Sequence, residues 1–284
     1  MWSTPLIKRL LLILAFFPSL AWGQANYQAT SGLIGDADPH ADTTMTLPAH
    51  LTNDVIYCKA WVRDVDDTAS ITVATGWAAV TGYPNDRGTS TRTWMWWKRA
   101  ASASETSPVI DYSGTTADSY YECVSFRGAI TTETPHEVLG TPTDGTADPA
   151  TFTTISSLTA NSLIVLALEG EDNNNGPTPG CTTTGTNPAA YTEHYAEITT
   201  GTDAMTCWSE AVRTDAGATG TVSLNFDTAV PVGWDGVLMA IKPQPPPTGQ
   251  VIIITEKENH EIPIWNFAVA LDRWLRPRPQ THRA

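Results

Sequence analysis

The chain has 284 residues, which is enough for one or two domains, and a formal net charge of −14 at pH 7. Only 16% of the residues are charged, 41% are hydrophobic, and there are 20 glycines and 20 prolines. Such a composition is typical of short strands joined by many turns, and it excludes a helical bundle and a wholly disordered chain. The acidity also argues against a nucleic-acid partner, because the two polyanions would repel each other.

Residues 1–23 have the organisation of a secretory signal peptide. Lys8 and Arg9 precede an apolar run at residues 10–17, and AWG at residues 21–23 offers small side chains for cleavage before Gln24. The alternative, an uncleaved anchor, needs an apolar run of about 20 residues. We therefore expect a secreted protein, extracellular or at the cell surface, with no transmembrane span in the mature chain.

The four cysteines predict two disulfides, because an even number in an exported chain favours pairing. Three pairings are open. We favour Cys58–Cys123 with Cys181–Cys207, since each bridge then lies inside one of two repeats described below. Zinc binding is disfavoured, because the sequence has no C-x-x-C and no paired-histidine spacing.

The body of the chain predicts an all-β, antiparallel, jelly-roll-like β-sandwich. Residues 24–43, before the body, are polar and glycine-rich and predict an extended arm. Residues 244–284, after it, predict a proline-rich linker and a short tail. Alternating or apolar runs between turn residues predict strands at residues 44–47, 53–63, 71–74, 91–100, 109–112, 120–127, 152–155, 161–168, 205–212, 221–226 and 237–242.

The body, residues 44–243, is predicted to be one unit written twice, with halves at about 44–131 and 151–243. NDVIYCKA at residues 53–60 matches NSLIVLAL at residues 161–168, an offset of 108 residues. Trp94 matches Trp208 at a larger offset of 114 residues. The difference places an insertion in the second half, in the loop at residues 170–188. Because both halves keep this tryptophan, it is expected in the core.

The two halves run through a similar order of short motifs. The first half has GWAAV at 76–80 and VSFRG at 124–128, and AYTE at 190–193 and VLMAIKP at 237–243 stand at the corresponding places of the second. TANSL at 159–163 and GATGT at 217–221 also fit the pattern. This pattern resembles duplicated β-sandwich modules of bacteriophage tail or virion-associated proteins and of secreted bacterial multidomain proteins. The resemblance covers about residues 44–243. It implies a structural or binding role and offers no catalytic residues to carry over. The four cysteines, the tail and the signal peptide depart from the pattern, and the signal peptide favours a host-exported protein, because phage tails assemble in the cytoplasm.

Tryptophans are the candidate ligand-binding residues. Trp61, Trp77, Trp96 and Trp97 could stack on sugar rings, since exposed aromatic patches often mark binding sites. The alternative is ordinary packing in the core. Trp96 and Trp97 have no counterparts in the second half and are the better candidates, and Trp97 is preferred because Trp96 shares a strand face with the expected core residue Trp94.

Two acidic loops at equivalent places are candidate Ca²⁺ ligands. Asp64, Asp66 and Asp67 lie in one loop, and Glu171 and Asp172 lie in the other. Carboxylate oxygens suit Ca²⁺, which takes six to eight oxygen ligands. The full D-x-D-x-D-G…E spacing is absent, so a plain solvated loop is the alternative. No other cofactor is expected.

The sequence therefore predicts a secreted, non-enzymatic binding or structural protein, acting in adhesion, glycan binding or extracellular or virion-like assembly. A glycan or a surface protein is the expected partner, and self-association is open. The alternative is a secreted glycan-active hydrolase or lyase, for which Asp111, Glu122, Glu169 and Glu210 would supply carboxylates. No catalytic residue is assigned, because G-x-S-x-G, H-E-x-x-H and phosphate-binding glycine motifs are all missing.

Residues 262–275 predict an amphipathic segment after the proline-rich linker. Its charged residues make it too short and too polar to span a membrane. The sequence leaves open whether it serves in oligomerisation, in binding a membrane surface, or as a flexible tail.

Overall fold

The computed structural model describes residues 24–36, 43–63, 70–73, 75–87, 91–113, 118–156, 158–171, 180–198, 204–226 and 233–245. The chain divides into two units, Met1–Pro246 and Pro247–Ala284, and all the described residues belong to the first. Within these ranges every element is a strand, and the strands pair antiparallel. The all-β, antiparallel fold expected from the sequence is confirmed. The expected signal peptide and the segment 262–275 lie outside the described residues.

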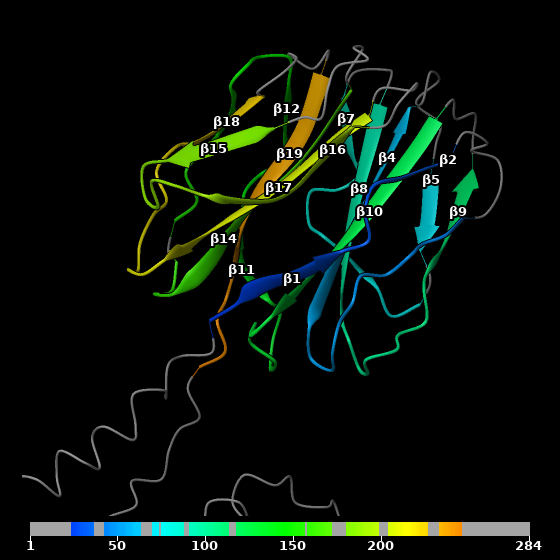
Figure 1. Cartoon of the computed structure of the whole chain (residues 1–284), viewed down its shortest axis with the longest axis horizontal. Coiled ribbons are helices and arrows are strands. Elements are labelled where there is room, and N and C mark those ends of the chain that lie inside the picture. The colour runs from blue at the N-terminus through cyan, green and yellow to red at the C-terminus, as the bar shows by residue number, and fades with distance from the viewer. Residues whose placement is uncertain are drawn as a thin grey trace, which may run out of the picture. The chain divides into compact units, whose positions relative to one another are not determined.

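The first half of the chain forms one large and one small sheet (Figure 1). The first large sheet contains, in spatial order, β1 (Asn26–Thr30), β10 (Asp118–Arg127), β4 (Val55–Arg63), β8 (Thr91–Arg99) and β6 (Ala78–Ala79), with β2 (Ile34–Asp36) also on β10 and β7 (Asn85–Arg87) also on β8. The first outer sheet contains β3 (Thr43–Thr44), β9 (Val109–Ser113) and β5 (Ser70–Val73).

The second half forms a matching pair of sheets. The second large sheet contains, in spatial order, β11 (His136–Leu139), β19 (Gly233–Ile241), β14 (Ser162–Glu171), β17 (Ala204–Arg213) and β16 (Thr192–Ile198), with β12 (Thr143–Gly145) also on β19. The second outer sheet contains β13 (Ala150–Phe152), β18 (Val222–Phe226) and β15 (Cys181–Gly185). The strand orders of the two halves correspond, except that β7 of the first large sheet has no counterpart among the described strands of the second. The duplication at the level of sequence remains a prediction.

The four sheets stack in layers, with the two large sheets in the middle and an outer sheet on each side (Figure 1). The space between the large sheets holds what we call the central core, with residues from both halves, among them Tyr57, Phe126, Val165 and Trp208. A separate core lies under each outer sheet. Each large sheet therefore buries both of its faces. Most candidate residues on these sheets are buried for this reason.

Strand β4 shows how double burial departs from the sequence expectation. Its more apolar face, with Ile56, Cys58, Ala60 and Val62, packs under the first outer sheet. The opposite face, which begins with Val55 and Tyr57, is equally buried in the central core. Alternation alone indicates one buried face, but a strand between two layers has no wet face.

The pairing registers correct one expected match between the halves. Trp94 pairs with Ala60 on β4, whereas Trp208 pairs with Ala167 on β14. Trp208 therefore takes the position of Met95, one residue further along the strand. Since neighbouring strand residues point to opposite faces, Trp94 packs under the first outer sheet while Trp208 packs in the central core.

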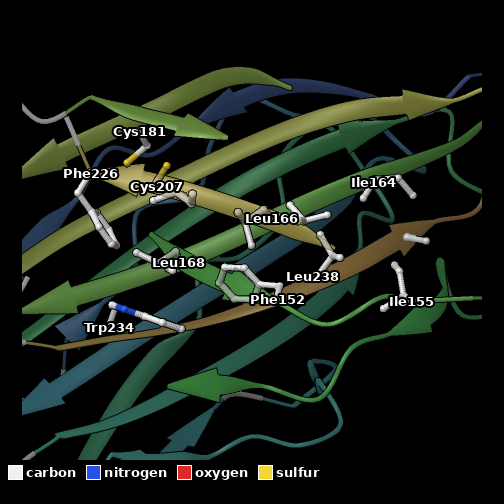
Figure 2. Packing of buried hydrophobic residues seen from close by; sticks show 14 of the residues in the cluster. Phe152, Ile155, Ile164, Leu166, Leu168, Cys181, Cys207, Phe226, Trp234 and Leu238 are labelled. Atoms are coloured by element: carbon white, nitrogen blue, oxygen red, sulfur yellow. The ribbon is translucent and has the colours of Figure 1, made fainter. Parts of the chain in front are cut away.

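One of the two expected disulfides is present. Cys58 and Cys123 face each other on β4 and β10, with Cα atoms 4.1 Å apart, and are bonded. Cys181 and Cys207 are instead free thiols. They lie next to each other, on β15 and β17, in the core under the second outer sheet, close to Phe226 (Figure 2).

The expected arm before the first half and the connection between the halves both contribute strands to the large sheets. Within the expected arm, β1 and β2 both pair with β10. Within the connection between the halves, β11 and β12 both pair with β19. These strands are short and polar, so their own residue patterns gave little sign of them.

Candidate functional site

The central core is apolar at one end and polar at the other. Antiparallel pairing places Arg63, Thr91 and Asp118 side by side at one end of the first large sheet. The strand positions next to this end carry ionisable side chains that point into the central core. They are Lys59 on β4, Glu122 on β10, Glu169 on β14 and Asp235 on β19. With Thr206 and Trp208 of β17, we call them the inter-sheet cluster.

All four ionisable side chains of the cluster are buried: Glu122, Lys59, Glu169 and Asp235 are 0%, 1%, 2% and 4% exposed. Burying a charge is costly unless it is paired and hydrogen-bonded. The contacts of each group therefore decide which of them is ionised.

Glu122 is held by three donors. Thr206 Oγ1 and Trp208 Nε1 both donate to its Oε2 at 2.6 Å, and Thr30 Oγ1 donates to its Oε1 at 3.0 Å. The donors come from β17 of the second large sheet and from β1 of the first, so this carboxylate ties the two sheets together. Burial raises the pKa of Glu122, while Lys59 and the three donors oppose the rise.

Lys59 supplies the one positive charge of the cluster. Its Nζ donates to the carbonyl oxygen of Leu168 at 2.8 Å and to Thr206 Oγ1 at 3.3 Å. The ammonium lies 4.8 Å from the centre of the Trp208 ring, in cation–π distance. Every one of these partners belongs to the opposite large sheet.

Glu169 is the group with the fewest contacts. Its Oε1 lies 3.7 Å from Lys59 Nζ, beyond hydrogen-bond distance, and neither oxygen has a hydrogen-bond partner among the described residues. Burial raises the pKa of Glu169 to about 8, the charge of Lys59 opposes the rise, and the neighbouring carboxyls of Asp235 and Glu122 add smaller contributions to it. At neutral pH Glu169 is therefore a neutral acid.

Asp235 completes the cluster on the side of β7. It accepts hydrogen bonds from Asn85 Nδ2 and, at 3.3 Å, from Tyr83 Oη. Burial raises the pKa of Asp235 to about 7, although Asn85, Lys59 and Tyr83 act in the opposite direction. Asp235 is thus close to half protonated at neutral pH.

A second polar group lies near the cluster at the edge formed by β1 and β16. Tyr27 stacks on His194 with ring centres 4.1 Å apart, and His194 Nε2 lies 2.8 Å from Glu210 Oε1. Glu210 Oε2 also accepts from the backbone N–H of Tyr27 at 3.2 Å. These contacts again join the first large sheet to the second.

The four candidate tryptophans do not form a shared binding surface. Trp96 and Trp61 are only 6% and 4% exposed, and they lie on opposite faces of the first large sheet. Trp97 packs half-buried against the central core, and Trp77 packs against the core under the first outer sheet. Trp61, Trp96 and Trp97 lie on strands of a sheet that is covered on both faces, so sugar stacking on these rings stays a prediction without support from the packing.

The candidate calcium ligands receive no support. Asp64, Asp66, Asp67 and Asp172 lie outside the described residues, and of Glu171 only its place at the end of β14 is described. The part of the chain that the structure describes has no group of three or more His, Cys, Asp or Glu side chains placed to hold a metal ion.

The four carboxylates of the hydrolase alternative are not set around a common cleft. Glu122 and Glu169 meet inside the central core, and Glu210 lies near the β1 and β16 edge. Asp111 lies on β9 of the first outer sheet, in another layer. Sequence reasoning named Glu122 and Glu169 only as carboxylates for the hydrolase alternative, and it missed Lys59 and Asp235 as members of a site.

An open pocket of about 560 Å³ lies away from the cluster, lined by residues 44–50 and by Ala103, Glu105 and Ser107. Its titratable side chains serve the fold. Glu105 pairs with Lys98 at 2.6 Å, and His50 Nε2 accepts from the backbone N–H of Glu105 at 3.3 Å. The wall of this pocket therefore presents no ionisable group aimed at a ligand.

Among the described residues, fold and cluster together define an all-β protein of stacked sheets with a group of ionisable side chains buried inside it. We find no helix in the described ranges with the length and hydropathy that a bilayer crossing needs. Comparison with protein-family models, with curated proteins and with solved structures finds no match to this chain.

Proposed function

We propose that the chain is a secreted, non-catalytic structural protein that serves in adhesion or extracellular assembly. The observation that carries the proposal is the position of the cluster. Groups with strongly raised pKa values often mark active sites, but here they are buried between two large sheets. A substrate would have to separate the sheets to reach them, so their role is to join the halves.

Secretion is part of the proposal. It is supported by the signal-peptide features of residues 1–23 and by the Cys58–Cys123 bond, since disulfides persist mainly in oxidising compartments. Protein collected from the culture medium should begin at Gln24, which N-terminal sequencing reads directly. A product that keeps residues 1–23 and stays in the cell would contradict secretion.

The experiment that tests the proposed function is a glycan and surface-protein array combined with a reducing-sugar assay on the same sample. We expect no release of reducing ends from any glycan, and retention on a surface ligand. Turnover that is lost in Glu122→Gln, with the fold intact by circular dichroism, would overturn the non-catalytic role in favour of a glycan-active enzyme.

A further inference from the structure

Lys59 and Glu169 face each other across the central core, one on each large sheet. Lys59 Nζ and Glu169 Oε1 are 3.7 Å apart, and the two side chains are 1% and 3% exposed. Buried carboxyl groups are almost always hydrogen-bonded, yet neither oxygen of Glu169 has such a partner among the described residues. An unpartnered carboxyl beside a buried amine, with water excluded, is an arrangement suited to amide formation.

We propose that Lys59 and Glu169 condense into an intramolecular isopeptide bond that joins the two large sheets. Lys59 Nζ attacks Glu169 Cδ, and the hydroxyl of the Glu169 carboxyl leaves as water. The inference stands on the geometry of the cluster and does not depend on the proposed adhesive function. The bond would link β4 to β14 at the polar end of the central core, opposite the apolar end.

Glu169 is in the protonation state that the reaction needs. A neutral carboxylic acid is attacked far more readily than a carboxylate, which repels the nucleophile. Burial and, to a smaller extent, the carboxyls of Asp235 and Glu122 raise the pKa of Glu169 to about 8 even though Lys59 opposes the rise, so the acid form is favoured at neutral pH.

A path for the proton of the ammonium is present. Thr206 Oγ1 lies 3.3 Å from Lys59 Nζ and donates to Glu122 Oε2 at 2.6 Å. A proton can therefore pass from Nζ through the threonine hydroxyl to the carboxylate of Glu122. Burial raises the pKa of Glu122, which makes it a stronger base. Glu122 acts through Thr206 and is a positioning residue, held by Trp208 and Thr30.

The atoms and charges balance without any co-reactant. The ammonium brings three hydrogens and the neutral carboxyl brings one. In the product one hydrogen stays on the amide nitrogen, two leave in the water molecule, and one remains on Glu122. The C–N bond forms, the C–OH bond breaks, and no atom is oxidised or reduced.

Proximity and charge both favour the product. Well-oriented intramolecular reactions reach effective molarities of about 10⁵ M or more, and the two reacting groups are already held by packed strands. The condensation also consumes the buried ammonium of Lys59 and leaves a proton on the buried carboxylate of Glu122, which removes the cost of keeping these two charges in the core.

The test is the mass of the full-length secreted protein, measured after reduction of the disulfide and denaturation. We expect a mass 18 Da below that of the uncondensed mature chain. Tryptic digestion should leave the bond after Lys59 uncut and yield one branched peptide that joins the Lys59 and Glu169 segments. This readout on the natural chain needs no variant, so a substitution that fails to fold cannot hide the answer.

Variants distinguish the role of the proton path from the need for the two bonded residues, Lys59 and Glu169. Glu122→Gln keeps both Lys59 and Glu169 and should lower the cross-linked fraction at least tenfold, while Glu122→Asp should restore much of it. Thr206→Val should act like Glu122→Gln, because it removes the hydroxyl of the proton path. Lys59→Met should abolish the mass loss.

Two results would overturn the inference. The first is a folded wild-type protein, with cooperative unfolding, whose mass shows no loss of 18 Da. The second is a loss of 18 Da that peptide mapping places elsewhere, for example between Lys59 and Asp235. A Glu122→Gln variant as fully cross-linked as the wild type would overturn the assigned proton path.

Discussion

Asp235 links stability to pH at the scale of a single residue. It is 4% exposed, and burial raises its pKa to about 7, against an ordinary value of 3.8. Below the ordinary value the carboxyl is protonated in the folded and the unfolded chain alike. As pH rises from about 4 to about 7 the unfolded chain ionises while the folded chain keeps its proton, so stability is lost across this window and is not regained above it.

Asp235→Asn imitates the protonated acid and should flatten this loss. At about 1.4 kcal/mol for each unit of pKa difference, the variant should gain on the order of 2–4 kcal/mol relative to wild type between pH 4 and pH 8. Urea unfolding at a series of pH values measures the difference. Asp215→Asn is the matched control, because Asp215 is an exposed aspartate outside the inter-sheet cluster. It should retain the wild-type pH dependence, and equal profiles for Asp235→Asn and wild type would contradict the expectation.

Trp208 combines packing with a hydrogen bond to a buried charge. Its ring is 1% exposed and its Nε1 donates to Glu122 Oε2 at 2.6 Å. Trp208→Phe removes the donor, and a hydrogen bond to a charged group is worth about 1.5–3 kcal/mol; the smaller ring adds a packing loss.

The chain contains a control for this substitution. Trp234 is 4% exposed, and its Nε1 donates to the neutral carbonyl oxygen of Ala147 at 2.9 Å. Trp234→Phe should therefore cost less than Trp208→Phe, with a hydrogen-bond contribution of about 0.5–1.5 kcal/mol. Chemical denaturation of both variants compares them, and the reverse order would show that Glu122 is not ionised.

At the scale of elements, the turns that lead into β4 and β14 use the same backbone device. Asn53 and Asn161 have φ values of 72° and 65°, and they are the non-glycine residues with positive φ in the described part of the chain. Asparagine tolerates this left-handed region better than most residues, because its short side chain can bond locally. The two turns start the central strands of the two large sheets.

Asn161→Ala should therefore lower stability by roughly 1 kcal/mol, the cost of placing an ordinary side chain in the left-handed region, whereas Asn161→Gly should be close to neutral. Thermal unfolding of the two variants measures the difference. A contrasting pair at Asn225, an exposed residue inside β18, should show the opposite preference, since glycine weakens a strand interior. Equal melting temperatures for both Asn161 variants would argue against the left-handed turn.

The long strands could be predicted from the sequence, and the short ones could not. The runs at residues 53–63 and 91–100 became β4 and β8 within about two residues at each end, because a core strand carries its own alternation. The sequence did not predict four short strands, β1, β2, β11 and β12. Their own residues are largely polar, and they form strands because they pair with β10 and β19.

The inter-sheet cluster could not be predicted from the sequence for a related reason. Lys59 alternates with apolar residues on β4, which is how the wet face of a half-buried strand looks. Its burial depends on β14 and β17, more than a hundred residues further along, and no local pattern reports a second sheet above the first. Glu122 and Glu169 were noticed as carboxylates for the same local reason, without any sign that they meet.

At the scale of the whole molecule, the central core makes each half dependent on the other. The first large sheet contributes Tyr57, Met95 and Phe126 to it, and the second contributes Val165 and Trp208. Separated halves would expose these apolar faces together with the unpaired charges of the cluster. Contiguous apolar patches of this kind lead to association or aggregation.

We therefore expect fragments 24–131 and 132–245 to fold only together. The junction is suitable for a cut, because residues 131–134 are exposed and carry no strand. On either side of it the halves stay in contact, since Ile130 N–H donates to Lys242 O at 2.9 Å and Gln244 N–H donates to Gly128 O at 2.8 Å. Co-expressed fragments should co-purify through a tag on one of them, while each fragment expressed alone should aggregate.

The control is the intact body with a protease site inserted at the same junction and cut after folding, which should keep the wild-type circular dichroism and melting behaviour. A single fragment that stays monomeric and unfolds cooperatively would show that the central core is an interface between independent domains. Denaturing electrophoresis of the co-purified pair adds a separate reading. The fragments run apart if only packing joins them, and they run as one band under reducing conditions if Lys59 of one is bonded to Glu169 of the other.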